Sequence, residues 1–166
     1  MRKVSKRSLA REAARVRNPR ADYYAWKMEE TARLFDDLRI LSDSGTPIIV
    51  EGRRDEAALR RLGVKGRIYC IKARGESRHD FLERLDGTPD AIILTDFDRE
   101  GKKLETWLYK ELSQRGVKSD LKMWSRIRSL ARTEVRSVEE LPSFVRALEH
   151  RAIGRRPLVA RVPRNL

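Results

Sequence analysis

Short apolar runs alternate with amphipathic segments through the middle of the chain. Most of these runs are apolar almost throughout, as in strands that are covered on both faces. The predicted strands are 48–50, 67–71, 91–95 and, more weakly, 121–124, and the predicted helices are 54–62, 77–85, 100–114 and 138–150. This alternation predicts an α/β fold, in which helices flank a mainly parallel sheet of about four strands.

A longer helix is predicted ahead of the first strand, from about residue 22 to residue 42. Trp26, Leu34 and Leu38 recur there at helical spacing, and a Gly and a Pro follow. A short basic helix is predicted at 5–17. The chain therefore divides into a basic N-terminal arm (1–20), an N-terminal helix (21–45), a domain that ends in a helix (46–150) and a basic C-terminal arm (151–166).

The two ends of the chain carry most of the net charge of +13. Residues 1–20 hold eight Lys or Arg and one acid, and residues 151–166 hold five Arg and no acid. Arginine binds phosphate through paired hydrogen bonds, so basic arms on a nearly neutral domain favour nucleic acid as a partner. Solvated tails are the alternative interpretation. The arginines expected to bind phosphate include Arg7, Arg11, Arg15, Arg155 and Arg156.

The composition excludes several classes of protein. A single cysteine, Cys70, rules out a disulfide framework and a Cys-based zinc module. No apolar stretch approaches the roughly 20 residues of a membrane span, and the basic N-terminus lacks the apolar region of a secretory signal. Neither a P-loop nor a G-x-G-x-x-G turn is present. These features predict a cytoplasmic protein without a membrane partner.

Carboxylates follow two of the predicted strands at equivalent positions. Glu51 follows the first strand, with Asp55 in the next helix, and Asp96 and Asp98 follow the third strand. Adjacent parallel strands lie about 4.8 Å apart, so Glu51, Asp96 and Asp98 are expected to converge if these strands are neighbours. Converging carboxylates repel one another unless a cation neutralises them or one of them is protonated.

Such a cluster suits Mg²⁺, or alternatively Mn²⁺, as a cofactor. Mg²⁺ prefers oxygen ligands and is bound by one or two carboxylates together with waters and substrate phosphate. Metal ions at such a site activate water and neutralise the leaving oxygen in phosphodiester chemistry. Gly52 and Gly101 are expected to let a phosphate backbone approach closely. Each acidic motif alone is weak, and their joint placement after two buried strands indicates the site.

The sequences IIVEGRRDEAAL (48–59) and AIILTDFDREGKKL (91–104) resemble the two signature motifs of the Toprim domain. Type IA topoisomerases, DnaG-type primases, OLD-family nucleases, RecR and the bacterial ribonuclease that matures 5S ribosomal RNA share this domain. The resemblance covers residues 46–127 or so. It implies a Rossmann-like Toprim fold for this part of the chain.

The resemblance also implies roles for the acids. Glu51 would act as a general acid or base, and Asp96 and Asp98 would coordinate Mg²⁺ beside it. Asp55 matches a further acid of the primase and nuclease versions. The chain length argues against a topoisomerase and against a DnaG-type primase with its further domains, the single cysteine against RecR, and the missing P-loop against an OLD nuclease. The remaining group is the small stand-alone, archaeal-type Toprim proteins, which are similar in size to the 5S-maturing ribonuclease.

Three functions are compatible with these features. The first is a Mg²⁺-dependent nuclease that acts on structured RNA or DNA, with RNA favoured, and uses the four acids for catalysis. The second is a non-catalytic module that binds RNA or a ribonucleoprotein. The third is a primase-like nucleotidyl transferase.

Further basic residues are expected near the substrate. Lys72, Arg74 and Arg78 follow the second strand and are predicted to bind phosphate, with a solvated loop as the alternative. A third basic stretch consists of Arg126, Arg128, Arg132 and Arg136. Glu134, Glu139 and Glu140 are weaker candidates for a second metal ligand, and Trp107 and Trp124 are expected in the core.

Overall fold

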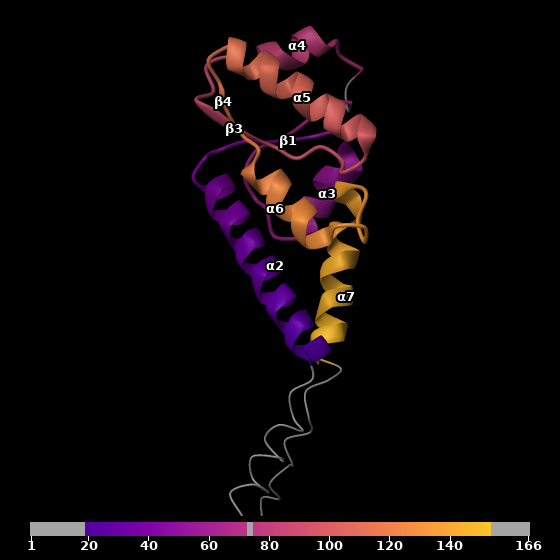
Figure 1. Ribbon diagram of the computed structural model, residues 1–166. Coiled ribbons are helices and arrows are strands. Elements are labelled where there is room, and N and C mark those ends of the chain that lie inside the picture. Colours follow the sequence, from indigo (N-terminus) through magenta and orange to yellow (C-terminus); the bar gives the residue numbers. More distant parts are fainter. Residues whose placement is uncertain (1–18, 73–74, 154–166) are drawn as a thin grey trace, which may run out of the picture.

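The computed structural model describes residues 19–72 and 75–153. In these residues, four parallel strands form one sheet in the order β2-β1-β3-β4 (Figure 1). The strands are β1 (Ile48–Val50), β2 (Ile68–Cys70), β3 (Asp90–Ile93) and β4 (Lys118–Asp120). The predicted α/β class with a four-stranded parallel sheet is therefore confirmed.

Helices cover both faces of the sheet (Figure 1). One face carries α4 (Arg78–Glu83) and α5 (Arg99–Gln114). The opposite face carries α2 (Pro19–Asp43), α3 (Arg53–Arg61), α6 (Lys122–Ala131) and α7 (Leu141–Ile153), the last directly preceded by the 3₁₀ turn η1 (Val138–Glu140). The predicted N-terminal helix is α2, which packs against α6 and α7.

The sheet separates two hydrophobic cores, because successive residues of a strand point to opposite faces. Ile48 packs with α2, α6 and α7, whereas Ile49 packs with α4 and α5. Ile92 and Ile93 divide between the two cores in the same way. All four side chains are fully buried, which explains why β1 is apolar throughout and why β3 is apolar after Asp90.

The fourth strand was predicted at 121–124, and this prediction is wrong. The strand β4 lies just before it, and the side chain of Asp120 accepts a hydrogen bond of 2.6 Å from the backbone N–H of Lys122, where α6 begins. Trp124 is buried on the inner face of α6 together with Ile127. Four residues are too few to reveal their period, which becomes helical only when Ile127 is included.

Serine is the N-cap residue of both α4 and η1. The Ser77 side chain accepts a hydrogen bond from the backbone N–H of Asp80 at the start of α4. Ser137 and Glu140 form a capping box around η1, so the helix predicted at 138–150 starts as a 3₁₀ turn and continues as α7. The predicted helix at 5–17 and the arginines Arg7, Arg11, Arg15, Arg74, Arg155 and Arg156 lie outside the described residues.

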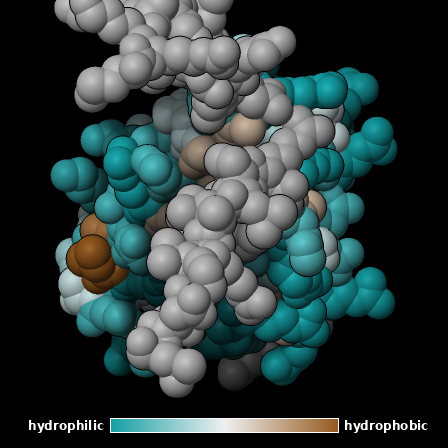
Figure 2. All heavy atoms as spheres, turned by 90° about the horizontal axis from the view of Figure 1, so that it is seen from below, coloured by the Kyte–Doolittle hydropathy of each residue, from teal (hydrophilic) through white to brown (hydrophobic). Residues whose placement is uncertain are grey.

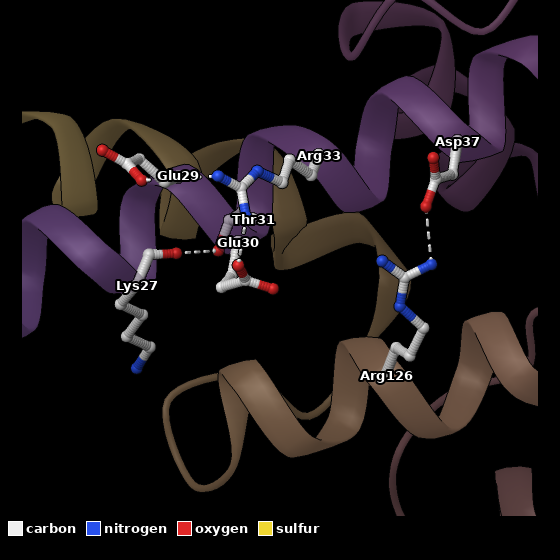
Figure 3. A network of polar contacts seen from close by, with 7 residues as sticks. All are labelled: Lys27, Glu29, Glu30, Thr31, Arg33, Asp37 and Arg126. Atoms are coloured by element: carbon white, nitrogen blue, oxygen red, sulfur yellow. Dashed lines mark hydrogen bonds and ion pairs between the residues drawn. The ribbon is translucent and has the colours of Figure 1, made fainter.

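The outward face of the helices below the sheet in Figure 1 is largely hydrophilic. Figure 2 shows mainly hydrophilic side chains on the described surface seen from below. Along α2, Arg33 pairs with Glu30 at 2.8 Å, and Asp37 accepts a hydrogen bond of 2.7 Å from Arg126 of α6 (Figure 3). Among the helices of residues 19–72 and 75–153, none has both the length and the apolar composition that crossing a membrane requires.

A buried lysine connects α2 to the C-terminal part of the domain. The Lys27 side chain is only 4% exposed, and its Nζ lies 2.5 Å from Glu134 Oε1. The other carboxylate oxygen of Glu134 accepts a hydrogen bond of 2.7 Å from Arg151 of α7. Burial raises the pKa of Glu134, but the hydrogen bonds from Lys27 and Arg151 outweigh burial and leave that pKa below its usual value.

Replacing Glu134 should destabilise the fold more than replacing its buried partner. Glu134→Gln leaves the Lys27 ammonium buried without its anion, whereas Lys27→Met removes the charge and keeps most of the volume. We expect Glu134→Gln to lower the free energy of unfolding by about 1–3 kcal/mol, less than for a fully buried pair because Glu134 is partly exposed. Urea unfolding of both variants measures this, and a larger loss in Lys27→Met would contradict it.

Candidate metal centre at the carboxyl edge of the sheet

Glu51 and Asp96 lie at the carboxyl ends of neighbouring strands. The strands β1 and β3 pair in parallel with Ile49 opposite Ile93, and the backbone N–H of Leu94 donates to the carbonyl of Ile49 at 2.8 Å. Just beyond this pairing, Glu51 Oε1 accepts a hydrogen bond of 3.2 Å from the backbone N–H of Asp96. The two strands are neighbours, which is the condition on which the expected convergence depended, and their pairing brings these two acids together.

Glu51 is also held by a lysine. Its side chain is mostly buried, and its Oε2 accepts a hydrogen bond of 2.5 Å from Lys72 Nζ. The backbone N–H of Lys72 donates to the carbonyl of Glu51 at 2.8 Å, which fixes the two residues side by side. The hydrogen bond to Glu51 raises the pKa of Lys72. Lys72 thus lies at the predicted edge, where it neutralises a carboxylate.

Asp96 is the centre of the acidic cluster. Its Oδ1 accepts a hydrogen bond of 2.9 Å from the backbone N–H of Val138. Burial raises the pKa of Asp96 to about 6 although this hydrogen bond opposes the shift, and the charges of Asp55, Glu51 and Asp98 raise it further. All four predicted acids therefore lie close enough to interact electrostatically.

Asp55 and Asp98 occupy the starts of the two helices that follow the strands. Asp98 is exposed, and its Oδ1 accepts a hydrogen bond of 2.7 Å from Gly101 N–H at the start of α5. Asp55 is buried in α3, and its Oδ2 accepts one of 2.9 Å from Gly52 N–H. Burial raises the pKa of Asp55; the Gly52 hydrogen bond opposes this shift, and the charge of Glu51 adds to it.

The donor set fits Mg²⁺. Within the described residues, no three His, Cys, Asp or Glu side chains form a ready-made group that could hold a metal ion. Mg²⁺ does not require such a cage, because it keeps several waters and takes only one or two carboxylates. No described residue donates a hydrogen bond to Oδ2 of Asp96 or of Asp98. These hard oxygens, in a cluster whose negative charges raise the Asp96 pKa, suit a divalent cation.

The helix α6, which was not expected from the sequence, packs against the loop that carries Asp96. In α6, the indole N–H of Trp124 donates to the carbonyl of Thr95 at 3.0 Å, and its ring packs against Phe97 with centroids 5.8 Å apart. The backbone N–H of Phe97 donates to the carbonyl of Arg136 at 2.8 Å. Trp124 therefore belongs to the core as predicted, and it also positions the acidic loop.

The two motif glycines have different surroundings. A Cβ on Gly101 would lie 2.1 Å from the carbonyl oxygen of Asp96, whereas a Cβ on Gly52 would have no atom within 4 Å. Gly101 therefore lets α5 pack against the acidic loop, which corrects the prediction that it opens the site to phosphate. The open space beside Gly52 is compatible with the predicted approach of a phosphate backbone.

Several other predicted residues are engaged elsewhere. Arg126 pairs with Asp37, the guanidinium of Arg128 lies 5.1 Å from the Trp124 ring centroid, and Glu134 pairs with Lys27. The Glu140 carboxylate accepts hydrogen bonds from the backbone N–H groups of Arg136 and Ser137. Glu134 and Glu140 are therefore poor candidates for a second metal ligand. By contrast, Lys72 and Arg78 both line a cavity beside Glu51.

The glycine contacts lead to a matched pair of variants. Gly101→Ala forces α5 or the Asp96 loop to move, because the added Cβ would overlap the Asp96 carbonyl. We expect it to lower the free energy of unfolding by about 1–3 kcal/mol. Gly52→Ala is the control, since its φ of −147° is open to any residue and its surroundings are empty. Chemical denaturation should separate the two variants, and equal losses would contradict this account.

The raised pKa of Asp96 leads to a pH dependence. Because the pKa of Asp96 is higher in the folded than in the unfolded state, the free energy of unfolding falls as the pH rises from about 4 to about 6. Above the folded pKa of about 6 it falls no further on account of this group. Asp96→Asn removes this loss of stability and retains an oxygen for Val138 N–H. In EDTA, the variant should therefore melt above the wild type at neutral pH and converge with it in acid. A variant that melts lower at neutral pH would refute the prediction.

Comparisons with known proteins identify the fold and the family. A model of the Toprim domain matches residues 45–120. A UPF0292 protein of Methanosarcina acetivorans is 34% identical over 128 residues, covering 76% of this chain and 88% of the relative. The UPF0292 protein TV1259 of Thermoplasma volcanium is 42% identical over 109 residues, covering 64% of this chain and 89% of the relative.

A solved structure of a protein from Aquifex aeolicus has the same fold. It superposes with a TM-score of 0.57 at 22% identity and covers 65% of this chain and 94% of its own. The relatives and the matching domain agree with the resemblance of the two acidic motifs. Toprim domains bind divalent metal ions, typically Mg²⁺, and are associated with nucleic acid. The chain belongs to the UPF0292 family of Toprim-domain proteins.

Proposed function

We propose that this protein is a Mg²⁺-dependent nuclease that acts on structured RNA, in preference to DNA, in the cytoplasm. The observation that carries the proposal is the hydrogen bond between Glu51 and the backbone of Asp96 inside a cluster of repelling acids. Such a cluster lowers the stability of the fold, and groups with pKa values shifted in this way are typical of sites that perform chemistry. The free, buried thiol of Cys70 is consistent with a reducing compartment.

In this proposal, Asp96 and Asp98 hold the metal through their free oxygens, with Glu51 beside them. Bound Mg²⁺ would neutralise charge on the phosphate and promote ionisation of the attacking water. Glu51 would accept the proton of that water or protonate the leaving oxygen. Lys72, whose side chain is 66% exposed, would move from Glu51 to a phosphate oxygen. Asp55 would assist by fixing Gly52 N–H at the start of α3.

The basic arms would supply most of the affinity for the nucleic-acid backbone. They join the described residues at the start of α2 and the end of α7, which lie side by side (Figure 1). The guanidinium of Arg151 on α7 lies 5.5 Å from the Tyr24 ring centroid on α2, near both ends. The arms, which contain Arg7, Arg11, Arg15, Arg155 and Arg156, are thus joined to the described residues at one end of the domain.

A non-catalytic module that binds RNA or a ribonucleoprotein is the second candidate. One observation favours it: Lys72 already neutralises Glu51 through a hydrogen bond of 2.5 Å. A cluster with its own cation can fold without a metal and can present its basic residues to RNA. The two candidates differ in whether Glu51 exchanges a proton with substrate.

The test measures cleavage and binding in parallel. Wild type, Glu51→Gln and Asp98→Asn are incubated with structured RNA, single-stranded DNA and duplex DNA in Mg²⁺ or Mn²⁺. We expect metal-dependent cleavage in the wild type, and a reduction of roughly 10²–10⁴-fold in Glu51→Gln with RNA affinity retained. Glu29→Gln removes an exposed carboxylate on α2 and serves as the matched control.

Two results would contradict the nuclease proposal. Wild-type protein that binds RNA tightly but does not cleave it would support the binding module. Cleavage that persists undiminished in both Glu51→Gln and Asp98→Asn would identify a contaminating nuclease.

A further inference from the structure

A cavity of about 480 Å³ lies beside Glu51. Ile71, which follows β2, Leu104 and Trp107 of α5, and Arg78 of α4 contribute to its wall, together with Lys72. Its volume is in the ~300–1,000 Å³ range of sites for small organic ligands. The cavity therefore has room for a group larger than a metal ion or a phosphate alone.

Part of the wall is apolar and aromatic. Ile71 and Leu104 are buried in the core between the sheet and the helices α4 and α5. Trp107 packs against the same core but is partly exposed. Trp107 was expected to be a core residue, and the sequence did not predict that it also lines an open cavity. A ligand that fills the cavity thus meets an apolar surface with a flat ring.

The charged part of the wall holds one cation without an acidic partner. Glu76 pairs with Arg84 at 2.6 Å, and Glu100 pairs with Lys103 at 2.7 Å. Arg78 has no carboxylate partner among the described residues, and its guanidinium lies 4.7 Å from the Trp107 ring centroid. This cation–π contact does not neutralise the guanidinium, so its N–H groups are available to an anion.

We infer that this cavity is a subsite for one unpaired nucleotide of the substrate strand, an inference that rests on the proposed nuclease function. Arg78 and Lys72 bind a phosphate of that nucleotide, and its base packs against the surface formed by Leu104 and Trp107. A planar apolar group joined to an anion is what this wall complements. Glu51 belongs to both the cavity and the acidic cluster, so the nucleotide adjoins the reacting phosphate.

This placement restricts the substrate. A base enters such a cavity only when it is unstacked from its neighbours, and a base in a duplex is not. The scissile phosphate should therefore lie next to a loop, bulge or unpaired end within a structured RNA. A continuous duplex would bind through its phosphates but leave the cavity empty.

The test compares binding to single-stranded and to duplex RNA in EDTA, so that no turnover occurs. Arg78→Gln removes the guanidinium and Trp107→Leu removes the aromatic ring, and each should weaken binding of a short single-stranded RNA roughly 5- to 100-fold. For duplex RNA, Trp107→Leu should change the affinity by less than about 3-fold. Arg78→Gln should weaken duplex binding only by the loss of one phosphate contact. Arg61→Gln and Tyr109→Leu, both exposed and outside this cavity, are the matched controls.

A second arm uses a free nucleoside 5′-monophosphate as the probe. Equal losses for the strand and for the mononucleotide support a nucleotide subsite. Mononucleotide binding that depends on Trp107, combined with unchanged strand affinity, overturns the substrate role and indicates a site for a free nucleotide. Because Trp107→Leu can perturb the core, Arg78→Gln decides the case if the Trp107 variant does not fold.

The subsite and the nuclease activity can fail independently. If the wild type cleaves RNA and Arg78→Gln leaves both the KM and the strand affinity unchanged, the subsite is refuted and the nuclease stands. If the wild type never cleaves but Arg78→Gln and Trp107→Leu still lose affinity for the single strand, the nuclease is refuted. In that case the cavity remains a nucleotide-binding site of an RNA-binding module.

Discussion

The parallel pairing of β1 with β3 is the constraint on which the rest of the site depends. It brings the end of one strand against the end of the other, so that Glu51 accepts a hydrogen bond from the backbone of Asp96. The sheet is held in place by a core on each face, and both strands contribute fully buried residues to both cores. A shift in strand register by one residue would transfer each side chain to the core on the other face, where it does not fit, and would also separate the acids. Packing and chemistry are therefore fixed by the same hydrogen bonds.

The acidic cluster works against the stability that the cores provide. Burial and neighbouring charges raise the pKa of Asp96 to about 6, so the fold must hold a carboxylate where a neutral group would be more stable. Two contacts reduce this cost without a metal, namely the hydrogen bond from Val138 N–H and the ammonium of Lys72 on Glu51, whereas the indole of Trp124 only holds the loop in place. None of them neutralises Asp96 itself. The electrostatic demand for a cation is thus concentrated at the carboxylate with a free oxygen.

The fold and the acids could be predicted from the sequence, whereas the partners that position them could not. Continuous apolar runs mark the buried strands, and Ser77 and Ser137 mark helix starts, because these signals are local. The α6 helix was missed because its inner face is visible only over a longer window. The contacts of Lys72 with Glu51, of Lys27 with Glu134 and of Arg78 with Trp107 join different secondary-structure elements, so no spacing along the chain announces them. They depend on which elements the folded chain brings together.

The hydrogen bond from Val138 to Asp96 extends the acidic site beyond the residues that match the Toprim domain. The Toprim model matches residues 45–120, and neither Val138 nor Trp124 lies in that range. The acidic loop is therefore completed by a segment that lies outside the matched residues, and α2 reaches the same segment through Lys27 and Glu134. Within this chain, the matched residues supply the four carboxylates, whereas Trp124 of α6 and Val138 of η1 hold the loop that carries Asp96. A change in either of these flanking elements would therefore alter the geometry of the centre while leaving every acid in place.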